Sequence, residues 1–313
     1  MIRLALVLPC YNEEEVLELS VERLSGLFDD LIRKEKISSD SFALFVNDGS
    51  KDSTWDVITT FHESYSFVKG LNLAHNVGHQ YAIMAGMMKA KDMSDAVVTI
   101  DADLQDELAC IEQMIDAYAK GFDIVYGVKV QRSADPWLKR VSAQMFYKLQ
   151  EKMGVNMVYN HADFRFLSKR TLEALSKYPE RNLYLRGLIP QIGFPSTTVE
   201  DHISERQAGV SKYTLSKMLN LALDGITSFS VKPLYYVVYT GIAFIFISFL
   251  IAIYVIYSLI AGNAQPGWAS LMLSLWFVGG VVLIALGVVG AYVGKIYGEV
   301  KQRPHYNIQD FLD

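Results

Sequence analysis

The sequence predicts an α/β domain with a mainly parallel sheet, followed by two membrane-spanning helices. Over residues 1 to about 130, short apolar runs alternate with longer amphipathic stretches. This alternation is typical of a parallel sheet covered by helices on both faces. Later, the 62 residues from Pro233 to Gly294 contain no Asp, Glu, Lys or Arg. A chain of 313 residues has enough material for both parts.

The expected elements of the domain follow directly from this alternation. The apolar runs predict strands at Leu4–Leu8, Phe42–Val46, Val68–Leu73, Val97–Ile100 and Ile124–Tyr126. The stretches between them predict helices at about 13–35, 52–66, 79–91 and 107–119. Pro9 ends the first apolar run early and no long basic segment precedes it, so we interpret that run as a strand and not as a secretory signal.

Two later stretches carry apolar residues at helical spacing. They are 136–154 and 211–230, and basic side chains flank the apolar stripe of the first. Such a stripe suits a helix packed on a core as well as a helix lying in a membrane interface. The second stretch leads directly into the uncharged block, so for this stretch a helix in the membrane interface is favoured at least as much as a helix packed on the core.

The uncharged block is expected to cross a membrane twice. Leu234–Ile260 and Trp268–Val293 are each long enough to span a bilayer as a helix, and turn residues separate them. The alternative, a buried helical hairpin in a soluble protein, is disfavoured by two such lengths without a charge. Basic residues flank the outer ends, at Lys212, Lys217, Lys232, Lys295, Lys301 and Arg303.

The linker between the spans carries no charge, so the positive-inside rule predicts that both termini lie in the cytoplasm. We therefore expect a protein of the inner, cytoplasmic membrane that contacts membrane lipids. The expected domains are a cytoplasmic α/β domain over 1–205, a juxtamembrane segment over 206–232, an anchor over 233–294 and a cytoplasmic tail over 295–313.

Net charge and cysteine content narrow the kinds of partner and metal site that the sequence allows. The net charge of −5 gives no global basic bias, which argues against nucleic acid as a partner. Cys10 and Cys110 are far apart and form no metal-binding pair, so we expect both to be reduced thiols. The sequence leaves self-association into a homo-oligomer open.

Polar clusters follow the first four predicted strands, at residues 9–14, 47–53, 75–80 and 101–106. Carboxyl ends of parallel strands share one edge of a sheet, where open α/β folds bind ligands. Tyr11 offers a ring for stacking a base, Asp48 an acceptor for base or ribose, and Asp103 with Gln105 oxygen ligands for a hard cation. Each cluster alone is also compatible with a solvated turn or a helix cap. Together they predict a nucleotide-diphosphate pocket.

The usual glycine-rich phosphate motifs are missing from the sequence. It contains no Walker-type loop, and no Gly-x-Gly-x-x-Gly follows the first strand. We therefore expect the diphosphate to be held through a metal ion and not by a glycine cradle.

The motifs Leu-Pro-Cys-Tyr-Asn-Glu-Glu, Val-Asn-Asp-Gly-Ser-Lys-Asp-Ser and Asp-Ala-Asp-Leu-Gln-Asp resemble those of family 2 glycosyltransferases with the Rossmann-like GT-A fold. More narrowly, the chain resembles the polyprenyl-phosphate glycosyltransferases, which include dolichol-phosphate mannose synthase-like enzymes and bactoprenol glucosyltransferases. Further matching motifs lie at residues 162–165, 179–182, 205–213 and 225–230. One departure is Glu107, because the family often has proline just after Leu-Gln-Asp.

The resemblance implies a role for each candidate residue. The donor nucleotide-sugar would be bound by Pro9, Tyr11, Asn12, Glu13, Asp48, Gln80, Asp101, Ala102, Asp103 and Arg206, and Mg²⁺ or Mn²⁺ by Asp101, Asp103 and Gln105. Catalytic roles fall to Asp163, Arg206 and Lys212, and the lipid phosphate to Arg132, Lys139, Arg140, Ser211 and Lys212. For Asp163, three roles stay open: a general base, a positioning group, or an ion pair with Arg165 that braces the fold.

The implied reaction moves a sugar from a UDP-sugar, with glucose the first choice, to undecaprenyl or another polyprenyl phosphate at the cytoplasmic face. Its products are the polyprenyl-phosphate sugar and UDP, formed by a metal-assisted single displacement with inversion. Two alternatives are a non-catalytic membrane scaffold that binds nucleotide-sugars and a tethered transferase with a soluble acceptor. A processive polysaccharide synthase is disfavoured, because the chain lacks its extra spans and its Gln-x-x-Arg-Trp motif.

Overall fold

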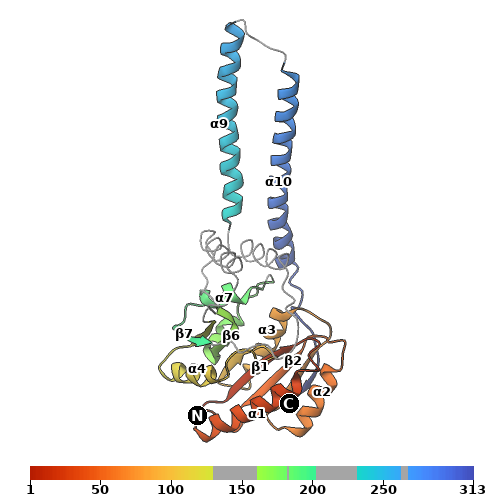
Figure 1. The fold of residues 1–313 in the computed structure, drawn as a ribbon, viewed down its shortest axis with the longest axis vertical. Helices are drawn as coiled ribbons and strands as arrows, with labels where there is room; N and C mark the ends of the chain where they lie inside the picture. The colour runs from red at the N-terminus through yellow and green to blue at the C-terminus, as the bar shows by residue number, and fades with distance from the viewer. Residues whose placement is uncertain (130–160, 182, 202–230, 262–266) are drawn as a thin grey trace. The chain divides into compact units, whose positions relative to one another are not determined.

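A computed structural model describes residues 1–129, 161–181, 183–201, 231–261 and 267–313. The chain divides into two units. Every strand in the described ranges belongs to the first unit, and the two long apolar helices belong to the second (Figure 1).

The first unit is built on one eight-stranded sheet with the order β7-β5-β6-β4-β1-β2-β3-β8. Neighbours run parallel from β4 through β1 and β2 to β3, and β7 is parallel to β5. Only β6 and β8 run antiparallel to their neighbours among the described strands, so the predicted mainly parallel sheet is confirmed. The strands are β1 (Leu4–Cys10), β2 (Phe42–Asn47), β3 (Val68–Leu73), β4 (Ala96–Thr99), β5 (Ile124–Lys129), β6 (His161–Ser168), β7 (Ser196–Asp201) and β8 (Ile308–Leu312).

Helices cover both faces of this sheet. The expected four are α1 (Leu17–Arg33), α2 (Thr54–Ser64), α3 (His79–Ala90) and α4 (Ala109–Ala119), joined by the short helices α6 (Lys169–Leu175) and α7 (Leu185–Gln191). All seven residues of β1 are buried, as expected of a central strand with two covered faces. Leu4, Leu6 and Leu8 share one core cluster with apolar residues of α1 and α4.

Helix α3 lies against the opposite face of the sheet. A Cβ atom on Gly86 would come within 2.4 Å of Val7 and 2.8 Å of Val46, so only glycine permits this approach. The close packing fixes the N-terminal end of α3, where His79 begins the helix, close to the carboxyl ends of the strands.

Three strands lie outside the sequence prediction. Strand β6 inserts antiparallel between β4 and β5 and pairs Arg165 with Thr99. Strand β7 adds to β5, and β8 closes the opposite end of the sheet beside β3. Residues 308–312, expected to be part of a tail, thus complete the sheet of the first unit.

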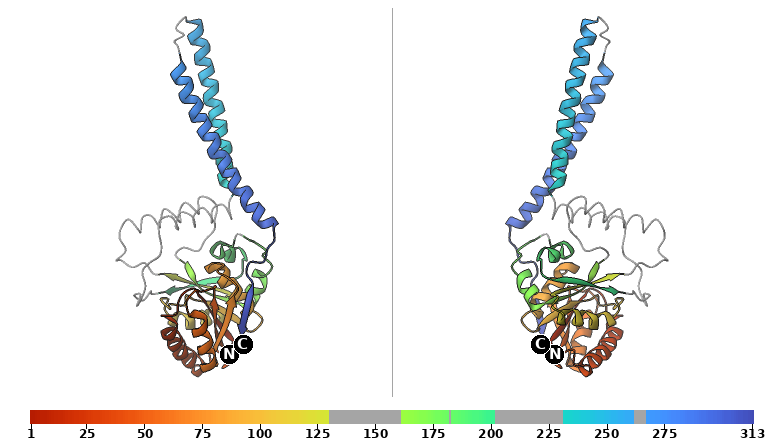
Figure 2. Two further views of the ribbon diagram at one scale, coloured as in Figure 1. Left: turned by 90° about the vertical axis from the view of Figure 1, so that its right-hand side faces the viewer. Right: turned by 90° about the vertical axis from the view of Figure 1, so that its left-hand side faces the viewer.

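The second unit contains α9 (Lys232–Ile260) and α10 (Trp268–Val300), which run side by side (Figure 2). The rings of Phe244 and Phe277 lie 5.5 Å apart between their centroids. Both helices contain windows long and apolar enough to cross a membrane, with 0% and 6% of those windows buried. Large apolar side chains such as Leu283 and Ile284 are 70% exposed. This surface suits lipid better than water, as the predicted two-span anchor requires.

Candidate active site

The carboxyl ends of β1, β2, β3 and β4 lie at one edge of the sheet. The register pairs Cys10 of β1 with Asn47 of β2, and Asn47 with Asn72 of β3. The polar clusters that follow these strands are therefore neighbours, as the sequence predicted.

The first two of these loops are joined by hydrogen bonds. The backbone N–H of Asn12 donates to Oγ of Ser50 at 3.0 Å, and the N–H of Lys51 donates to Oδ1 of Asn12 at 2.8 Å. Asn12 adopts a left-handed backbone with φ 55°, a conformation that asparagine tolerates better than most residues. Tyr11, beside it, is 39% exposed, which leaves its ring accessible for stacking.

Two further residues that were predicted to bind the nucleotide-sugar, Pro9 and Glu13, form part of the framework of these loops. Pro9 lies in β1 and is buried. The N–H of Glu13 donates to Oγ1 of Thr54 at 3.0 Å, at the start of α2.

Asp48 holds the third loop. Its side chain is buried, and its carboxylate accepts from the N–H of Val77 at 2.7 Å and of Gly78 at 3.0 Å. Burial raises the pKa of Asp48, and the two N–H groups offset part of that rise. In this structure Asp48 thus shapes the entry to α3. Each carboxylate oxygen still has acceptor capacity, so contact with a nucleoside stays a prediction.

The segment Asp101–Asp106 is a fixed loop and not a solvated turn. Ala102 and Leu104 are 4% and 1% exposed, within the core cluster. The carbonyl of Ala102 accepts from Oγ of Ser20 at 2.6 Å, and that of Leu104 accepts from the Arg23 guanidinium at 3.0 Å. Leu104 has φ 45°, so this buried residue adopts a strained left-handed backbone. Helix α1 therefore holds the loop from behind.

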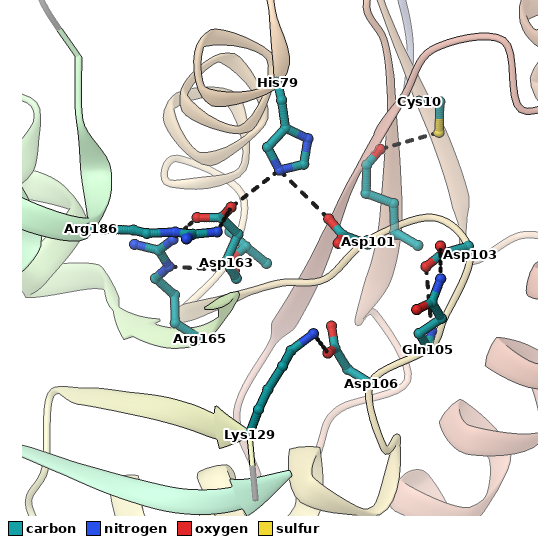
Figure 3. A network of polar contacts seen from close by, with 12 residues as sticks. Cys10, His79, Asp101, Asp103, Gln105, Asp106, Lys129, Asp163, Arg165 and Arg186 are labelled. Carbon is teal, nitrogen blue, oxygen red and sulfur yellow. Dashed lines mark hydrogen bonds and ion pairs between the residues drawn. The ribbon is translucent and has the colours of Figure 1, made fainter. Parts of the chain in front are cut away.

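The side chains that alternate with these anchor points are more exposed. Asp101 is half-exposed, and Asp103 and Gln105 are partly exposed. The Gln105 amide N–H donates to the Asp103 carboxylate, which leaves the Gln105 amide oxygen for another partner (Figure 3).

This donor set fits a hard divalent cation. Two carboxylates and an amide oxygen are ligands that Mg²⁺ and Mn²⁺ accept. Partial loss of hydration at the strand ends and the nearby charges of Asp163 and Asp103 raise the pKa of Asp101, although His79 opposes the shift, and a cation would relieve that crowding of negative charge. No group of three or more His, Cys, Asp or Glu side chains forms a ready metal site within the described ranges. A metal here would therefore need further oxygens from a substrate or from water.

Asp163 lies at the centre of a charged cluster (Figure 3). Arg165 is fully buried, and its guanidinium pairs with one carboxylate oxygen of Asp163. Arg186, on α7, donates to the other oxygen at 3.1 Å, and Nε2 of His79 lies 3.4 Å from the same atom.

Burial would raise the pKa of Asp163, but Arg186, His79 and Arg165 outweigh it and hold that pKa well below its usual range. An ionised carboxylate so strongly paired is a poor proton acceptor. Of the three roles open to Asp163, the geometry favours the ion pair and the positioning group over the general base.

Two further residues of this cluster, His79 and Arg186, are not among the site residues predicted from the sequence. Nε2 of His79 lies 3.4 Å from Asp163 and 3.6 Å from Asp101, so it bridges the two carboxylates. Burial lowers the pKa of His79, but the hydrogen bond to Asp163 and the nearby negative charges outweigh it and give a net rise. Gln80 is the residue that was predicted from the polar cluster 75–80. Its side-chain oxygen accepts from the N–H of Leu185 at 2.8 Å and so links α3 to α7.

The remaining predicted site residues lie outside the described residues. They are Arg132, Lys139, Arg140, Arg206, Ser211 and Lys212, together with the amphipathic stretches 136–154 and 211–230. The described edge therefore contains the candidate metal residues and every candidate donor residue except Arg206, and the candidate acceptor residues stay predictions.

Comparisons with known proteins give a consistent family. The model of the family described as glycosyl transferase family 2 matches residues 5–176. The uncharacterized glycosyltransferase YkoT of Bacillus subtilis (strain 168) is 48% identical, covering 97% of this chain and 90% of the relative. The SfII prophage-derived bactoprenol glucosyl transferase of Shigella flexneri is 40% identical, covering 98% of this chain and 97% of the relative.

Likeness to solved structures is more distant. The mannosyltransferase PcManGT from Pyrobaculum calidifontis, solved in complex with GDP-Man and Mn²⁺, is 13% identical, with a TM-score of 0.46. The match covers 96% of this chain and 87% of that one. A likeness of this size says nothing about the donor or the metal of this chain.

Proposed function

Since the chain belongs to glycosyl transferase family 2, we propose that it transfers a sugar from a UDP-sugar to undecaprenyl or another polyprenyl phosphate. The observation that carries the choice of acceptor is 40% identity to a bactoprenol glucosyl transferase over nearly the whole of both chains. Because that relative's name specifies a glucosyl group, glucose is the first choice of sugar.

The donor site of this proposal is the edge at the ends of β1 to β4. Tyr11 stacks on the base, and the loops of Asn12, Glu13 and Asp48 surround the nucleoside. When bound, Mg²⁺ or Mn²⁺ would be held by Asp101, Asp103 and Gln105 and would offset negative charge on the leaving diphosphate. The rigid backing of that loop by Ser20 and Arg23 supports this assignment, because it fixes where the carboxylates lie.

The transfer itself requires little proton movement. A phosphate oxygen of the lipid forms a bond to the anomeric carbon, the bond from that carbon to the diphosphate oxygen breaks, and UDP leaves with the electron pair. A phosphate monoester is mostly dianionic near neutral pH, so orientation matters more than deprotonation. This requirement agrees with the strongly paired Asp163, whose role is to position groups. A single displacement inverts the anomeric centre.

The acceptor phosphate is assigned to Arg206, Ser211 and Lys212, together with Arg132, Lys139 and Arg140. Guanidinium groups suit phosphate because they donate two parallel hydrogen bonds. These residues come from the sequence prediction, and they complete a division of work in which carboxylates serve the leaving group and basic residues serve the nucleophile.

In this proposal α9 and α10 anchor the enzyme in the inner membrane. In chain order the helix pair is preceded by β7 and followed by β8, two strands of one sheet, which supports an even number of crossings with both termini on one side. The flanking lysines and arginines favour the cytoplasmic side. A lipid acceptor never leaves the bilayer, so an anchored enzyme suits it.

The deciding experiment supplies the full-length protein in membranes with undecaprenyl phosphate, Mn²⁺ and a panel of radiolabelled UDP-sugars. We expect label to move into the organic phase from at least one donor, UDP-glucose first. Label that stays in a soluble product supports the tethered transferase instead, and UDP-sugar binding without transfer supports the scaffold.

A matched pair of variants tests the metal assignment in the same assay. Asp103→Ala is expected to lower transfer by at least about a hundredfold, because it removes a carboxylate from the proposed cation. Asp92→Ala removes a carboxylate that is 77% exposed, away from the strand ends, and is expected to retain activity. Full activity in Asp103→Ala would contradict the metal assignment.

A further inference from the structure

Strand β8 belongs to the sheet of the first unit, although it follows both apolar helices in the chain. It pairs antiparallel with β3, with Asp310 opposite Asn72. The N–H of Ala74 donates to the carbonyl of Asn307 at 3.0 Å. The Lys89 ammonium lies 3.8 Å from the ring centroid of Phe311. The strand therefore has a fixed register at this edge of the sheet.

A line of side-chain hydrogen bonds runs from β8 across two strands. Nδ2 of Asn72 donates to Oδ2 of Asp310 at 3.0 Å, and Nδ2 of Asn47 donates to Oδ1 of Asn72 at 2.8 Å. Oδ1 of Asn47 in turn accepts from the backbone N–H of Ser50 at 3.2 Å. Asn47 and Asn72 are both buried, so water does not replace these partners readily.

Both ends of this line require the same direction, because the Ser50 backbone N–H can only donate and the Asp310 carboxylate only accepts. An ionised carboxylate only accepts hydrogen bonds, so Asn72 must turn its NH₂ group toward Asp310. Its oxygen then faces Asn47, which must offer NH₂ there and keep its own oxygen toward the Ser50 N–H. Because an asparagine amide has one accepting and one donating end, fixing the first amide fixes the second.

The inner end of the line lies in the candidate donor site. Ser50 is the residue whose hydroxyl accepts from the N–H of Asn12, next to Tyr11. Gly49, between Asp48 and Ser50, has φ 59°, and a Cβ there would lie 2.4 Å from the backbone nitrogen of Asn76. The turn at 48–50 therefore has little freedom, and the Asn47 oxygen is one of its anchors.

We infer that Asp310 is a positioning residue for the donor nucleotide, acting through Asn72 and Asn47 on the Asp48–Ser50 turn. The inference rests on the proposed function, because it assumes that this turn contacts the nucleoside. It gives the strand beyond the second apolar helix a part in donor binding, with no contact between that strand and the donor.

The test removes the charge from the outer acceptor at nearly constant shape. Asp310→Asn replaces a carboxylate by a neutral amide oxygen, so the hydrogen bond from Asn72 loses its charge assistance and holds the line less firmly. Asp313→Asn is the matched control, because Asp313, the residue after β8, pairs with Lys69 of β3 and is not part of the line. Asp310→Glu keeps an acceptor-only group and serves as the conservative variant.

With purified full-length protein, we expect Asp310→Asn to weaken binding of UDP in the presence of Mn²⁺ about fivefold. Asp310 is itself exposed, and for that reason we expect no larger effect. The KM for the UDP-sugar should rise by the same factor while kcat and the KM for the lipid change less than about twofold. Asp313→Asn and Asp310→Glu should stay within about twofold of the natural chain. Equal UDP binding by Asp310→Asn and Asp313→Asn overturns the inference.

Amide hydrogen exchange at residues 48–51 provides a second readout that needs no ligand. It should be faster in Asp310→Asn than in Asp313→Asn if the line holds the turn. If the natural chain binds no UDP, the proposed function fails, and exchange still reports on the line. Should Asp310→Asn not fold, Asp310→Ser applies the same test, because a hydroxyl is also an uncharged acceptor. Unchanged exchange in the folded variant contradicts the inference independently of activity.

Discussion

His79 and Asp163 face each other across the strand ends, with Nε2 of the imidazole 3.4 Å from Oδ2 of the carboxylate. The histidine begins α3 and the aspartate lies in β6, so the contact joins two elements that are distant in sequence. The same Nε2 atom also lies 3.6 Å from Oδ1 of Asp101, a candidate metal ligand.

His79→Ala is expected to lower kcat/KM for the donor about tenfold. The substitution removes a group that bridges two carboxylates, and a hydrogen bond to a charged partner is worth about 1.5–3 kcal/mol, less when it is partly exposed. Steady-state kinetics at saturating lipid would measure the effect. His79→Gln, which keeps a donor near the same place, should recover part of the loss, and a rate within twofold of the natural chain for His79→Ala would contradict the role.

Asp163→Asn is expected to destabilise the protein by about 3–5 kcal/mol at neutral pH, because it leaves the fully buried Arg165 without its counter-charge. Thermal unfolding of the detergent-solubilised chain measures this change. Asp92→Asn, at an exposed site, provides the control and should change stability by less than about 0.5 kcal/mol.

Asp163 also predicts a pH dependence with a definite sign. Its pKa in the folded protein lies well below the usual value. The stabilisation is therefore fully present above the unfolded pKa of about 3.9 and is lost as pH falls through the folded value. The melting temperature of the natural chain should drop on acidification below about pH 4, and Asp163→Asn should show a smaller drop. If the melting temperatures of the two proteins fall equally on acidification, protonation of Asp163 is not the cause of the loss of stability.

Gly49→Ala and Gly26→Ala should have opposite effects on stability. At Gly49, φ is 59° and the new Cβ would lie 2.4 Å from a backbone nitrogen, so a loss of about 2 kcal/mol or more is expected. Gly26 lies within α1 with no heavy atom within 4 Å of the new Cβ, so alanine should add about 0.5–1 kcal/mol through helix propensity. Unfolding midpoints of the two variants measure both signs, and a neutral Gly49→Ala contradicts the close approach.

Ser20→Ala should weaken the response to metal without touching any metal ligand. The hydroxyl of Ser20 donates to the Ala102 carbonyl at 2.6 Å and holds the loop between Asp101 and Asp103. A buried carbonyl without a partner costs about 1–3 kcal/mol. The Mn²⁺ concentration that gives half-maximal activity should therefore rise about 5-fold or more. Ser25→Ala, on the same helix, is the control, and identical metal titrations of the two variants would argue against this role.

The parallel half of the sheet could be predicted from sequence because its strands are buried on both faces. β1, with all seven residues buried, reads as an unbroken apolar run, and so does β2. The strands that escaped prediction carry weaker signals. β7 alternates exposed and partly buried residues, and β6 contains Arg165, a charged side chain that is fully buried only because Asp163 pairs with it.

The candidate site divides in the same way. Asp101, Asp103 and Gln105 are adjacent in sequence and follow a strand, so a linear pattern reveals them. His79, Asp163 and Arg186 come from α3, β6 and α7, and only the antiparallel insertion of β6 beside β4 brings them together. Proximity of that kind has no period or motif in the sequence.

The position of β8 at the open edge of β3 also has a consequence for biosynthesis. A ribosome makes residues 308–312 only after both apolar helices have been translated, so the edge of β3 stays unpaired until then. An unpaired edge strand invites association with other chains. The first unit therefore completes its sheet only after α9 and α10 have been synthesised.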